Sequence, residues 1–389
     1  MTATGSTQIL HRITEAVPTL RHNGSQAERA GWIPAQNIGL LDDAGVFRMP
    51  VPEPHGGLAL SIADQTAVLA EIARGCGSTG WTALTWINNA WNATLFSAQA
   101  QQEVFAAGSV RVSGVFTPSG VAEPTDGGYL FTGQWRFNTG CRGADWNLVG
   151  AMCRPDGGEP YALFALIPMS AFDIADDWYV SAAAATGSAS TSTKNHFVPQ
   201  HLVVTADDLL GGGVADRLAA DKGRDYRMVS LSVAEATAVY IGMARGALES
   251  FLERLPGRAI PYTAWTDQRQ HPLTQRSVAL ATNKISAAEG LSAQVNDLLQ
   301  LRADQNTAPT LDERARTRGQ CATAVALVRE AVQELQTIAG SSALSLTAGF
   351  QRFHRDLLGL ATHALMAPDG GLEVHGRTIV GLDPGTPYL

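Results

Sequence analysis

Two short polar residues and a glycine, Asn138, Thr139 and Gly140, directly follow an alternating aromatic run in this 389-residue chain. Over 129–137 aromatic side chains alternate with other residues, which is the period-two pattern of a half-buried strand. Small side chains and a glycine at the end of such a strand let backbone amides approach a flat, polar ligand. The sequence therefore predicts a ligand contact where this strand ends. The aromatic face of the strand comprises Tyr129, Phe131, Trp135 and Phe137.

A second group of polar residues follows helical spacing between 78 and 92. These side chains carry no charge, whereas an exposed helix usually does, and the segment around them is rich in tryptophan. Buried uncharged polar groups need hydrogen-bond partners, which here could be a neighbouring subunit, water or a ligand. We therefore expect this stripe to find its hydrogen-bond partners in one of these three. The stripe comprises Ser78, Thr82, Thr85, Asn89 and Asn92.

A single histidine near the C-terminus is a candidate general base. His363 lies at helical spacing with Leu360 and Met366, so the pattern predicts a helix over 354–366. Histidine exchanges protons near neutral pH because its ordinary pKa is about 6.5. A lone histidine on an apolar helix face can equally be a hydrogen-bonded core residue. Both interpretations of His363 stay open on these residues alone.

Other kinds of site find little support in the sequence. No GxSxG, HExxH or Walker lysine motif occurs, and the nine histidines show no metal-ligand spacing, so no metal is predicted. Residues 75–80 satisfy G-x-G-x-x-G, but a segment of helical spacing precedes them where a dinucleotide-binding fold needs a strand. We expect a turn between two helices there.

Composition restricts the possible partners. A net charge of −8 argues against nucleic acid or an anionic membrane as the main partner, since both attract basic surfaces. No apolar run approaches the roughly 20 residues that span a bilayer, and the first residues do not resemble a secretory signal. Four scattered cysteines form no CxxC pair or disulfide pattern. We expect a cytoplasmic protein that binds a small molecule.

The pattern of the chain predicts a mainly helical α+β protein in three parts. Residues 1–109 are predicted to form a helical domain, residues 110–214 a β-domain of short strands, and residues 215–389 a four-helix bundle. The expected strands cover 110–116, 129–137, 146–152, 161–167 and 193–198. Long helices are expected over 226–255, 268–301 and 311–339, with a capping box at Thr310 and Glu313 and a C-cap at Gly340. The helix over 354–366 completes the bundle.

The order and spacing of several motifs resemble the acyl-CoA dehydrogenase fold, and more closely its flavin-dependent monooxygenase branch. The aromatic strand and its end resemble the flavin-contacting strand of that branch, with Asn138 and Thr139 in place of two serines. Further similar motifs are the Gly-Gly turn at 51–57, the helix start at 76–81, and the segment 351–356 followed by His363. The resemblance implies a helical domain, a central β-barrel-like domain and a C-terminal four-helix bundle.

The resemblance also implies roles for individual residues. His363 matches a catalytic histidine of several relatives, whereas Ala364 stands near the position of the catalytic glutamate of many acyl-CoA dehydrogenases. Asn89 replaces a histidine that often contacts substrate, so it is expected either to orient the substrate or to make a structural hydrogen bond. Implied flavin contacts are Trp135, Asn138, Thr139, Gly140, Thr186, Gly187 and Ser188, with Arg276, Ser341, Ser342 and Arg352 at the flavin phosphate across a subunit boundary. Implied substrate contacts are Trp81, Thr85, Asn89, Ser113 and His363.

The function implied by the resemblance is that of a reduced-flavin-dependent monooxygenase. Such an enzyme hydroxylates a phenol- or indole-type substrate through a flavin C4a-hydroperoxide, with Thr139 stabilising the flavin adduct and His363 activating the substrate. Molecular oxygen would be the co-substrate, and a separate NAD(P)H flavin reductase would supply FADH2 or FMNH2. A homotetramer is expected. The alternatives are an N-hydroxylating monooxygenase, an acyl-CoA dehydrogenase or oxidase, and a helical oligomer that has lost the flavin.

Overall fold

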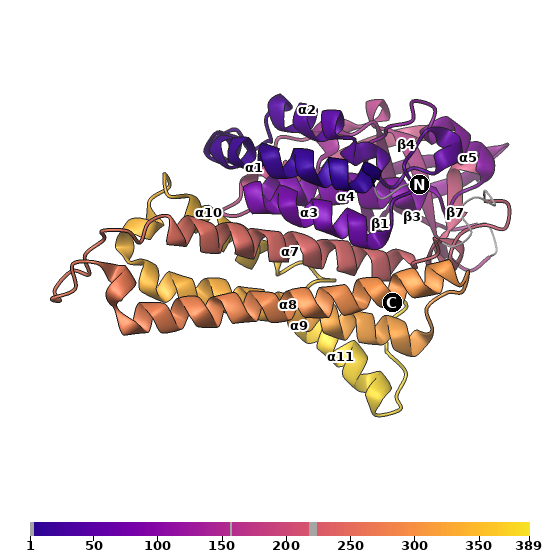
Figure 1. Cartoon of the computed structure of the whole chain (residues 1–389). Coiled ribbons are helices and arrows are strands. Elements are labelled where there is room, and N and C mark those ends of the chain that lie inside the picture. The colour runs from indigo at the N-terminus through magenta and orange to yellow at the C-terminus, as the bar shows by residue number, and fades with distance from the viewer. Residues whose placement is uncertain (1–3, 156–157, 218–223) are drawn as a thin grey trace.

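The computed structural model describes residues 4–155, 158–217 and 224–389 and confirms a mainly helical fold around a central sheet (Figure 1). Helices α1–α5 come first, a β-rich segment follows, and long helices form the C-terminal half. The N-terminal elements are α1 Thr4–Ala30, α2 Ala35–Ala44, α3 Ile62–Gly75, α4 Gly77–Ala93 and α5 Ala98–Val104. The C-terminal helices are α7 Met228–Leu252, α8 Pro272–Asp304, α9 Leu311–Ala339, α10 Gly349–Leu360 and α11 Pro368–Ile379.

The described strands form one seven-stranded sheet in the order β5-β6-β2-β1-β3-β4-β7. All five strands expected from the sequence are present, but β1 is longer than expected. It continues through Pro118, and its register against β3 shifts between Val115 and Gly120, because proline has no N–H for the ladder. The strands are β1 Val112–Thr125, β2 Gly128–Trp135, β3 Trp146–Cys153, β4 Tyr161–Pro168, β5 Asp173–Ile174, β6 Thr191–Pro199 and β7 Val203–Thr205, and α6 Ala206–Gly211 follows.

Helix α7 joins the two helical layers. It packs against α3 on one side and α9 on the other, and it runs between the N-terminal helices and the α8–α9 pair in Figure 1. The approach to α3 is close because Gly242 has no side chain: a Cβ there would lie 2.1 Å from the carbonyl oxygen of Ala70. The capping box of Thr310 and Glu313 at the start of α9 is confirmed, as is the C-cap at Gly340. No described helix is both long enough and apolar enough to cross a membrane.

The prediction of a helix over 354–366 is wrong about where the helix lies. Helix α10 begins at Gly349 and ends at Leu360, and an unexpected helix, α11, starts at Pro368 and packs against α9. Proline is favoured in the first helical turn and keeps the residue before it extended, so a new helix starts here instead of continuing α10. His363 consequently lies in the turn between α10 and α11 and not on a helix face.

Candidate active site

The strand β2 ends because the backbone turns at Phe137. This residue adopts a left-handed φ of 61°, leaves the aromatic face and becomes 64% exposed, where its ring meets that of Trp178 edge-on at 6.1 Å. Non-glycine residues seldom adopt such backbone angles, and they tend to occur at functional sites. The turn places the exposed Phe137, packed against the half-buried Trp178, next to Asn138 in the chain.

The backbone amides after the turn are directed into the protein. The amide of Asn138 donates to Ala189 O at 3.1 Å, that of Thr139 to Phe137 O at 3.0 Å, and that of Gly140 to Thr186 O at 3.1 Å. The expectation that these amides face a ligand is therefore not met. Among these three residues, the side-chain hydroxyl of Thr139 is the group left to face a ligand.

Asn138 is fully buried and connects three strands. Its Nδ2 donates to Asn147 Oδ1 at 3.0 Å and to Thr191 Oγ1 at 2.8 Å, while its Oδ1 accepts from Ser113. Ser113 Oγ also lies 2.7 Å from the carbonyl oxygen of Thr139. Asn138 and Ser113, expected as cofactor and substrate contacts, thus fix the loop that carries Thr139.

A chain of hydroxyl groups leads from Thr139 into the protein. Thr139 Oγ1 lies 2.8 Å from Ser188 Oγ, which lies 2.7 Å from Thr186 Oγ1, and Thr186 donates to the carbonyl oxygen of Ala183 at 2.9 Å. Because a carbonyl can only accept, the proton of Thr186 is used there, so Ser188 donates to Thr186 and Thr139 donates to Ser188. Thr139 Oγ1 therefore offers lone pairs to a ligand, and it accepts rather than donates.

Helix α10 holds the far end of this chain through a buried carboxyl group. Asp356 Oδ1 accepts the backbone N–H of Ala183 at 2.7 Å, and Asp356 Oδ2 accepts from Ser78 Oγ at 3.2 Å. Ala183 has a left-handed φ of 53°, which this contact stabilises. Burial raises the pKa of Asp356 to about 6. Sequence reasoning missed this role, although an Arg-Asp pair in the motif at 351–356 was the available signal.

Two of the expected cofactor contacts are packing residues, one within the β-domain and one between it and the N-terminal helices. Trp135 is fully buried, donates from Nε1 to Gly150 O at 2.7 Å, and packs edge-on against Phe172. Gly187 has a φ of 54° and lies against Trp32, where a Cβ would come within 2.6 Å of the indole ring. The structure does not bring Trp135 to the Thr139 hydroxyl chain.

The polar stripe on α4 is buried except for Thr85, which is half-buried, and its residues find hydrogen-bond partners inside the protein. Thr82 donates to Ser78 O at 2.9 Å and Thr85 donates to Trp81 O at 3.0 Å, which are bonds within the helix. Asn89 differs from these residues. Its Oδ1 accepts from Asn92, whereas its Nδ2 lies over Gly114, where a Cβ would be 2.8 Å away.

His363 and Trp81 form the aromatic part of the expected substrate site. Their rings meet edge-on at 5.8 Å, and Trp81 meets Tyr240 in the same way. The His363 side chain is reached by solvent, yet the surrounding protein desolvates it and lowers its pKa. Its Nδ1 accepts from the amide of Leu365 at 3.3 Å, so the neutral ring carries its proton on Nε2.

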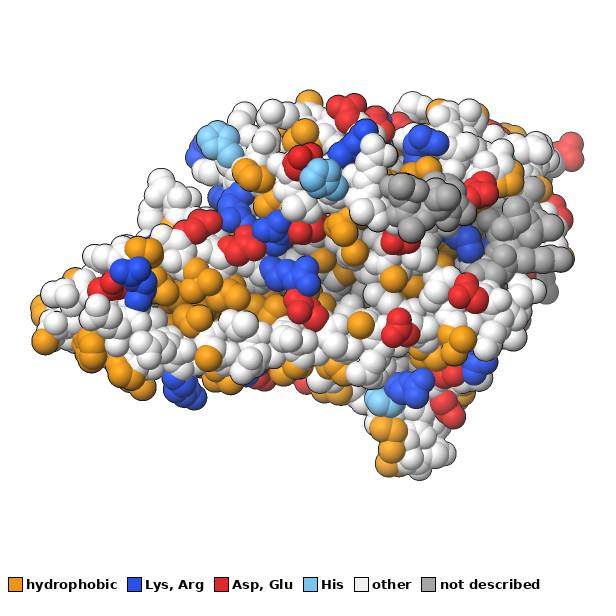
Figure 2. Space-filling model, in the orientation of Figure 1, with side chains coloured by type: hydrophobic (Ala, Val, Ile, Leu, Met, Phe, Trp, Pro, Cys, Tyr) orange, Lys and Arg blue, Asp and Glu red, His pale blue; other side chains and the backbone are white. Residues whose placement is uncertain are grey.

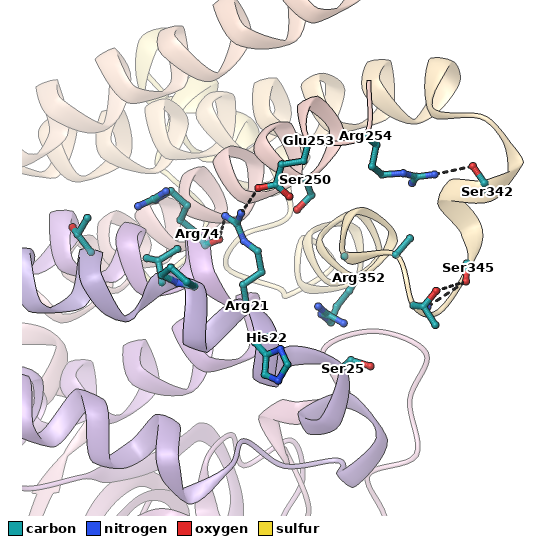
Figure 3. Close-up of a pocket in the computed structure, with 16 residues that line it drawn as sticks. Arg21, His22, Ser25, Arg74, Ser250, Glu253, Arg254, Ser342, Ser345 and Arg352 are labelled. Carbon is teal, nitrogen blue, oxygen red and sulfur yellow. Dashed lines mark hydrogen bonds and ion pairs between the residues drawn. The ribbon is translucent and has the colours of Figure 1, made fainter. Parts of the chain in front are cut away.

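A cavity of about 880 Å³ lies between α1, α3, α7 and α10 and contains several arginines (Figure 3). Arg352 and Ser342, two of the expected phosphate contacts, line it, and exposed Ser341 precedes Ser342 on the same turn. Arg276 does not line the cavity, because it lies on α8 and pairs with Glu334 at 3.0 Å.

Two arginines that sequence reasoning missed converge on Ser342. Arg254 and Arg258 donate to its Oγ at 2.7 and 3.1 Å, and within the described residues neither forms an ion pair with a carboxylate. Burial, together with the charge of Arg258, lowers the pKa of Arg254. The neighbouring Arg21 and Arg74 are instead paired with glutamates. The unpaired positive charge at Ser342 suits an anion such as a phosphate.

Comparison with known proteins agrees with this arrangement. The family models "Acyl-CoA dehydrogenase, N-terminal domain" and "Acyl-CoA dehydrogenase, C-terminal domain" match residues 11–110 and 234–368. The chain is 31% identical over 385 residues to the flavin-dependent monooxygenase oxygenase subunit HsaA of Mycobacterium tuberculosis (strain CDC 1551 / Oshkosh), covering 97% of this chain and 96% of the relative. It is 29% identical to the oxygenase component of the FADH(2)-dependent resorcinol hydroxylase of Rhizobium sp. (strain MTP-10005), covering 98% of this chain and 96% of that relative.

A solved structure extends the agreement to three dimensions. XiaF from Streptomyces sp., in complex with FADH2 and glycerol, superposes with a TM-score of 0.93 at 26% identity, covering 100% of this chain and 98% of that one. The fold and its motifs thus define a member of the acyl-CoA dehydrogenase fold family. Within that family, the chain belongs to the oxygenase components of two-component flavin-dependent monooxygenases.

Proposed function

We propose that this protein is a reduced-flavin-dependent monooxygenase that hydroxylates a small aromatic substrate. The observation that carries the proposal is the hydroxyl chain ending at Thr139, whose lone pairs are free two residues after the exposed Phe137. Reduced flavin has a ring N–H that needs an acceptor and an apolar face that needs an aromatic neighbour, so these residues fit it. When bound, the flavin supplies the electrons with which molecular oxygen is activated for insertion into the substrate.

The residues around Thr139 then have two tasks. Thr139 accepts a hydrogen bond from the flavin, while Phe137 and Trp178 exclude water that would divert the reaction towards hydrogen peroxide.

Trp81 and Asn89 orient the aromatic substrate. His363 takes or shares a substrate proton, since its lowered pKa keeps the imidazole neutral at working pH. Its Nδ1 contact at 3.3 Å is long, so changing tautomer requires the loss of only a weak bond.

Arg352, Arg254 and the Ser341–Ser342 turn are the proposed contacts of the flavin phosphate. In support of this, Arg352 is buried in the cavity wall with its nearest carboxylate, that of Glu28, 3.9 Å away. Such an arginine retains donors for an anion. Arg276 keeps its proposed role only if it acts from another subunit, because in its own chain it is exposed and paired with Glu334.

We propose a homotetramer served by a separate flavin reductase. Apolar side chains gather on the elongated helical end of the molecule and at the tip of α11 (Figure 2). A monomer seldom exposes so many large apolar residues on neighbouring elements. Those on α8, on the turn after α9 and near α11 are Leu273, Leu301, Leu344, Leu346, Leu372, Ile379 and Val380. Light scattering that gives a monomeric mass at full activity would contradict the tetramer.

Isotope labelling tests the proposed reaction. The full-length protein is supplied with FADH2 or FMNH2 by an added flavin reductase, under ¹⁸O-labelled oxygen. Resorcinol, p-hydroxyphenylacetate and indole-3-acetate serve as substrates, because relatives are named for acting on them. One labelled oxygen atom in the product supports the proposal. Product oxygen that comes entirely from water would rule it out.

A further inference from the structure

Two tryptophans lie against the loops that carry the proposed flavin contacts. Trp86 on α4 is fully buried and donates from Nε1 to the carbonyl oxygen of Gly140 at 3.1 Å. Trp32, which follows α1, packs against Gly187, and the two indole rings meet edge-on with their centres 6.2 Å apart. Trp32 is half-buried, so solvent reaches part of its ring. The pair therefore extends from the loop of Thr139 to the surface.

Three glycines make this close packing possible. A Cβ at Gly140 would lie 2.6 Å from Trp86 Nε1, and a Cβ at Gly187 would lie 2.6 Å from the Trp32 ring. Gly143 lies between the two indoles, since a Cβ there would be 2.9 Å from Trp86 and 3.0 Å from Trp32. A side chain at any of these positions would push a ring away. The two loops and the two indoles thus form one continuous path of packed atoms.

The two indoles differ in how well they tolerate the loss of an electron. The Arg111 guanidinium, paired with Asp145 at 3.0 Å, lies 5.8 Å from the centre of the Trp86 ring. The N–H of Trp86 is bonded to a carbonyl, which is too weak a base to take its proton, so an oxidised Trp86 stays cationic beside an arginine. The N–H of Trp32 is accepted by no group of the described residues, and water can take its proton. A radical formed at Trp86 is therefore expected to move to Trp32.

We propose that Trp86 and Trp32 form a one-electron path that protects the flavin site from oxygen radicals formed there. The oxidant is a hydroxyl radical, which arises when hydrogen peroxide takes one electron from reduced flavin. Trp86 gives one electron to this radical, which becomes hydroxide, and Trp32 gives one electron to Trp86. The indole proton of Trp32 then converts the hydroxide to water, and the neutral Trp32 radical takes a hydrogen atom from a soluble thiol, which becomes a thiyl radical. This inference rests on the proposed function, because the flavin reaction supplies the oxidant.

Mass spectrometry of tryptic peptides tests the protective role. The full-length protein is supplied with reduced flavin by an added reductase in air, without aromatic substrate or thiol, and with catalase to remove peroxide from the solution. We expect Trp32 to become oxidised, and this oxidation to be lost when glutathione is added. Trp86→Phe should abolish the oxidation of Trp32, because it interrupts the path and leaves Trp32 in place. No oxidation of Trp32 in the parent protein, or unchanged oxidation in Trp86→Phe, would overturn the inference.

Two tryptophans outside the path serve as controls. Trp91→Phe is the matched variant, because Trp91 is equally buried on α4 but its ring meets that of Tyr226. It should leave the oxidation of Trp32 at the parental level. Trp178 is half-buried like Trp32 and packs against the turn that ends β2, so its own oxidation should not change in Trp86→Phe. An equal loss of Trp32 oxidation in Trp91→Phe, or a parallel loss at Trp178, would mean general damage to the site and would overturn the inference.

A photo-oxidant attached near Thr139 tests the path without flavin. Phe137→Cys offers an attachment point for a ruthenium polypyridyl complex, because Phe137 is 64% exposed and the four native cysteines are buried. Every labelled protein also carries Trp178→Phe, because Trp178 adjoins Phe137. After a light flash in the presence of an electron acceptor, transient absorbance should show a neutral indolyl radical, which Trp32→Phe should abolish. This variant keeps the test valid if Trp86→Phe does not fold. The absence of the radical, or its persistence in Trp32→Phe, would contradict the path.

The two proposals fail separately. Labelled oxygen in the product, together with oxidation of Trp32 that does not depend on Trp86, contradicts the electron path alone. An indolyl radical at Trp32 in the ruthenium-labelled protein, together with product oxygen that comes from water, contradicts the proposed reaction alone.

Discussion

Asp356 on α10 accepts the backbone N–H of Ala183 at 2.7 Å and thereby ties the C-terminal helices to the loop that carries Thr186 and Ser188. This bond links two parts of the chain 173 residues apart. On α10, Arg352 lies one turn before Asp356 and lines the arginine cavity. The same helix therefore positions both the proposed flavin-ring site and the proposed phosphate site.

Replacing Asp356 should loosen the loop and weaken flavin binding. Asp356→Leu leaves the Ala183 amide and Ser78 without their acceptor, and an unpaired buried group costs about 1 to 3 kcal/mol. We expect the Kd for reduced flavin, measured by anaerobic titration, to rise roughly five- to a hundredfold. Asp356→Asn keeps an accepting oxygen, so its affinity for reduced flavin should fall much less. Equal Kd values for the two variants would show that the contact does not hold the loop.

The direction of the hydroxyl chain predicts how Thr139 acts. Thr139→Val keeps the volume but removes the lone pairs, so a larger share of reduced flavin should end as hydrogen peroxide. A hydrogen bond of about 1 kcal/mol corresponds to a change of roughly fivefold in the ratio of hydroxylated product to peroxide. Thr139→Ser keeps the hydroxyl and should behave like the parent protein. Unchanged coupling in Thr139→Val would exclude the hydroxyl from the reaction.

The pKa of His363 predicts the acidic limb of the pH profile. The protein around the imidazole lowers this pKa from its ordinary 6.5, so the ring stays neutral and able to accept a proton below pH 6.5. Hydroxylation, followed in single turnovers with reduced flavin, should therefore fall only as the pH drops below that value. His363→Ala should slow this step by roughly 10² to 10⁴-fold and abolish the limb. If His363→Ala hydroxylates at the parental rate and keeps the acidic limb of the pH profile, His363 is a structural residue.

Much of the fold follows from local patterns, because periodicity and caps depend on near neighbours. The capping box of Thr310 and Glu313 and the bounds of α9 were predictable for this reason. The end of α10 was not, because Leu360, His363 and Met366 continue a helical spacing that the chain does not follow. Pro368, which opens α11, was the signal for that break.

The site was less predictable than the fold, because its partners are distant in sequence. The amides of Asn138 and Gly140 are bonded to Ala189 and Thr186, about 50 residues further along the chain. No local pattern reveals such pairing. Glu235 in turn resembles an ordinary surface charge in a helical pattern, and only its burial between α4 and α7 distinguishes it.

The arginines at Ser342 make a prediction about the flavin phosphate. Arg254→Leu removes a cation that has no carboxylate partner among the described residues, so the Kd for FMNH2 should rise roughly tenfold or more. The matched control is Arg269→Leu, since Arg269 is exposed and paired with Asp267. It should bind the flavin like the parent protein. Equal effects of the two substitutions would point to the overall charge instead of a specific contact.

The raised pKa of Glu235 predicts how stability depends on pH. Unfolded, the carboxyl group releases its proton near pH 4.5, whereas burial keeps it protonated in the folded chain up to about pH 8. The folded state thus binds more protons between these values. The contribution of Glu235 to stability is fully present below pH 4.5 and is lost as the pH rises to 8, by at most about 1.4 kcal/mol per pH unit.

Glu235→Gln cannot titrate and should therefore flatten this dependence. Urea unfolding between pH 6.5 and 8 isolates the effect, because Asp356, with a pKa of about 6, is largely ionised by then. Over this window the free energy of unfolding should fall more steeply for the parent protein than for Glu235→Gln, by up to about 2 kcal/mol in total. Parallel curves for the two proteins would mean that the folded state already holds Glu235 ionised. In that case the acceptor of the Asn88 Nδ2 group would be a carboxylate, and the hydrogen bond between the two side chains would be charge-assisted.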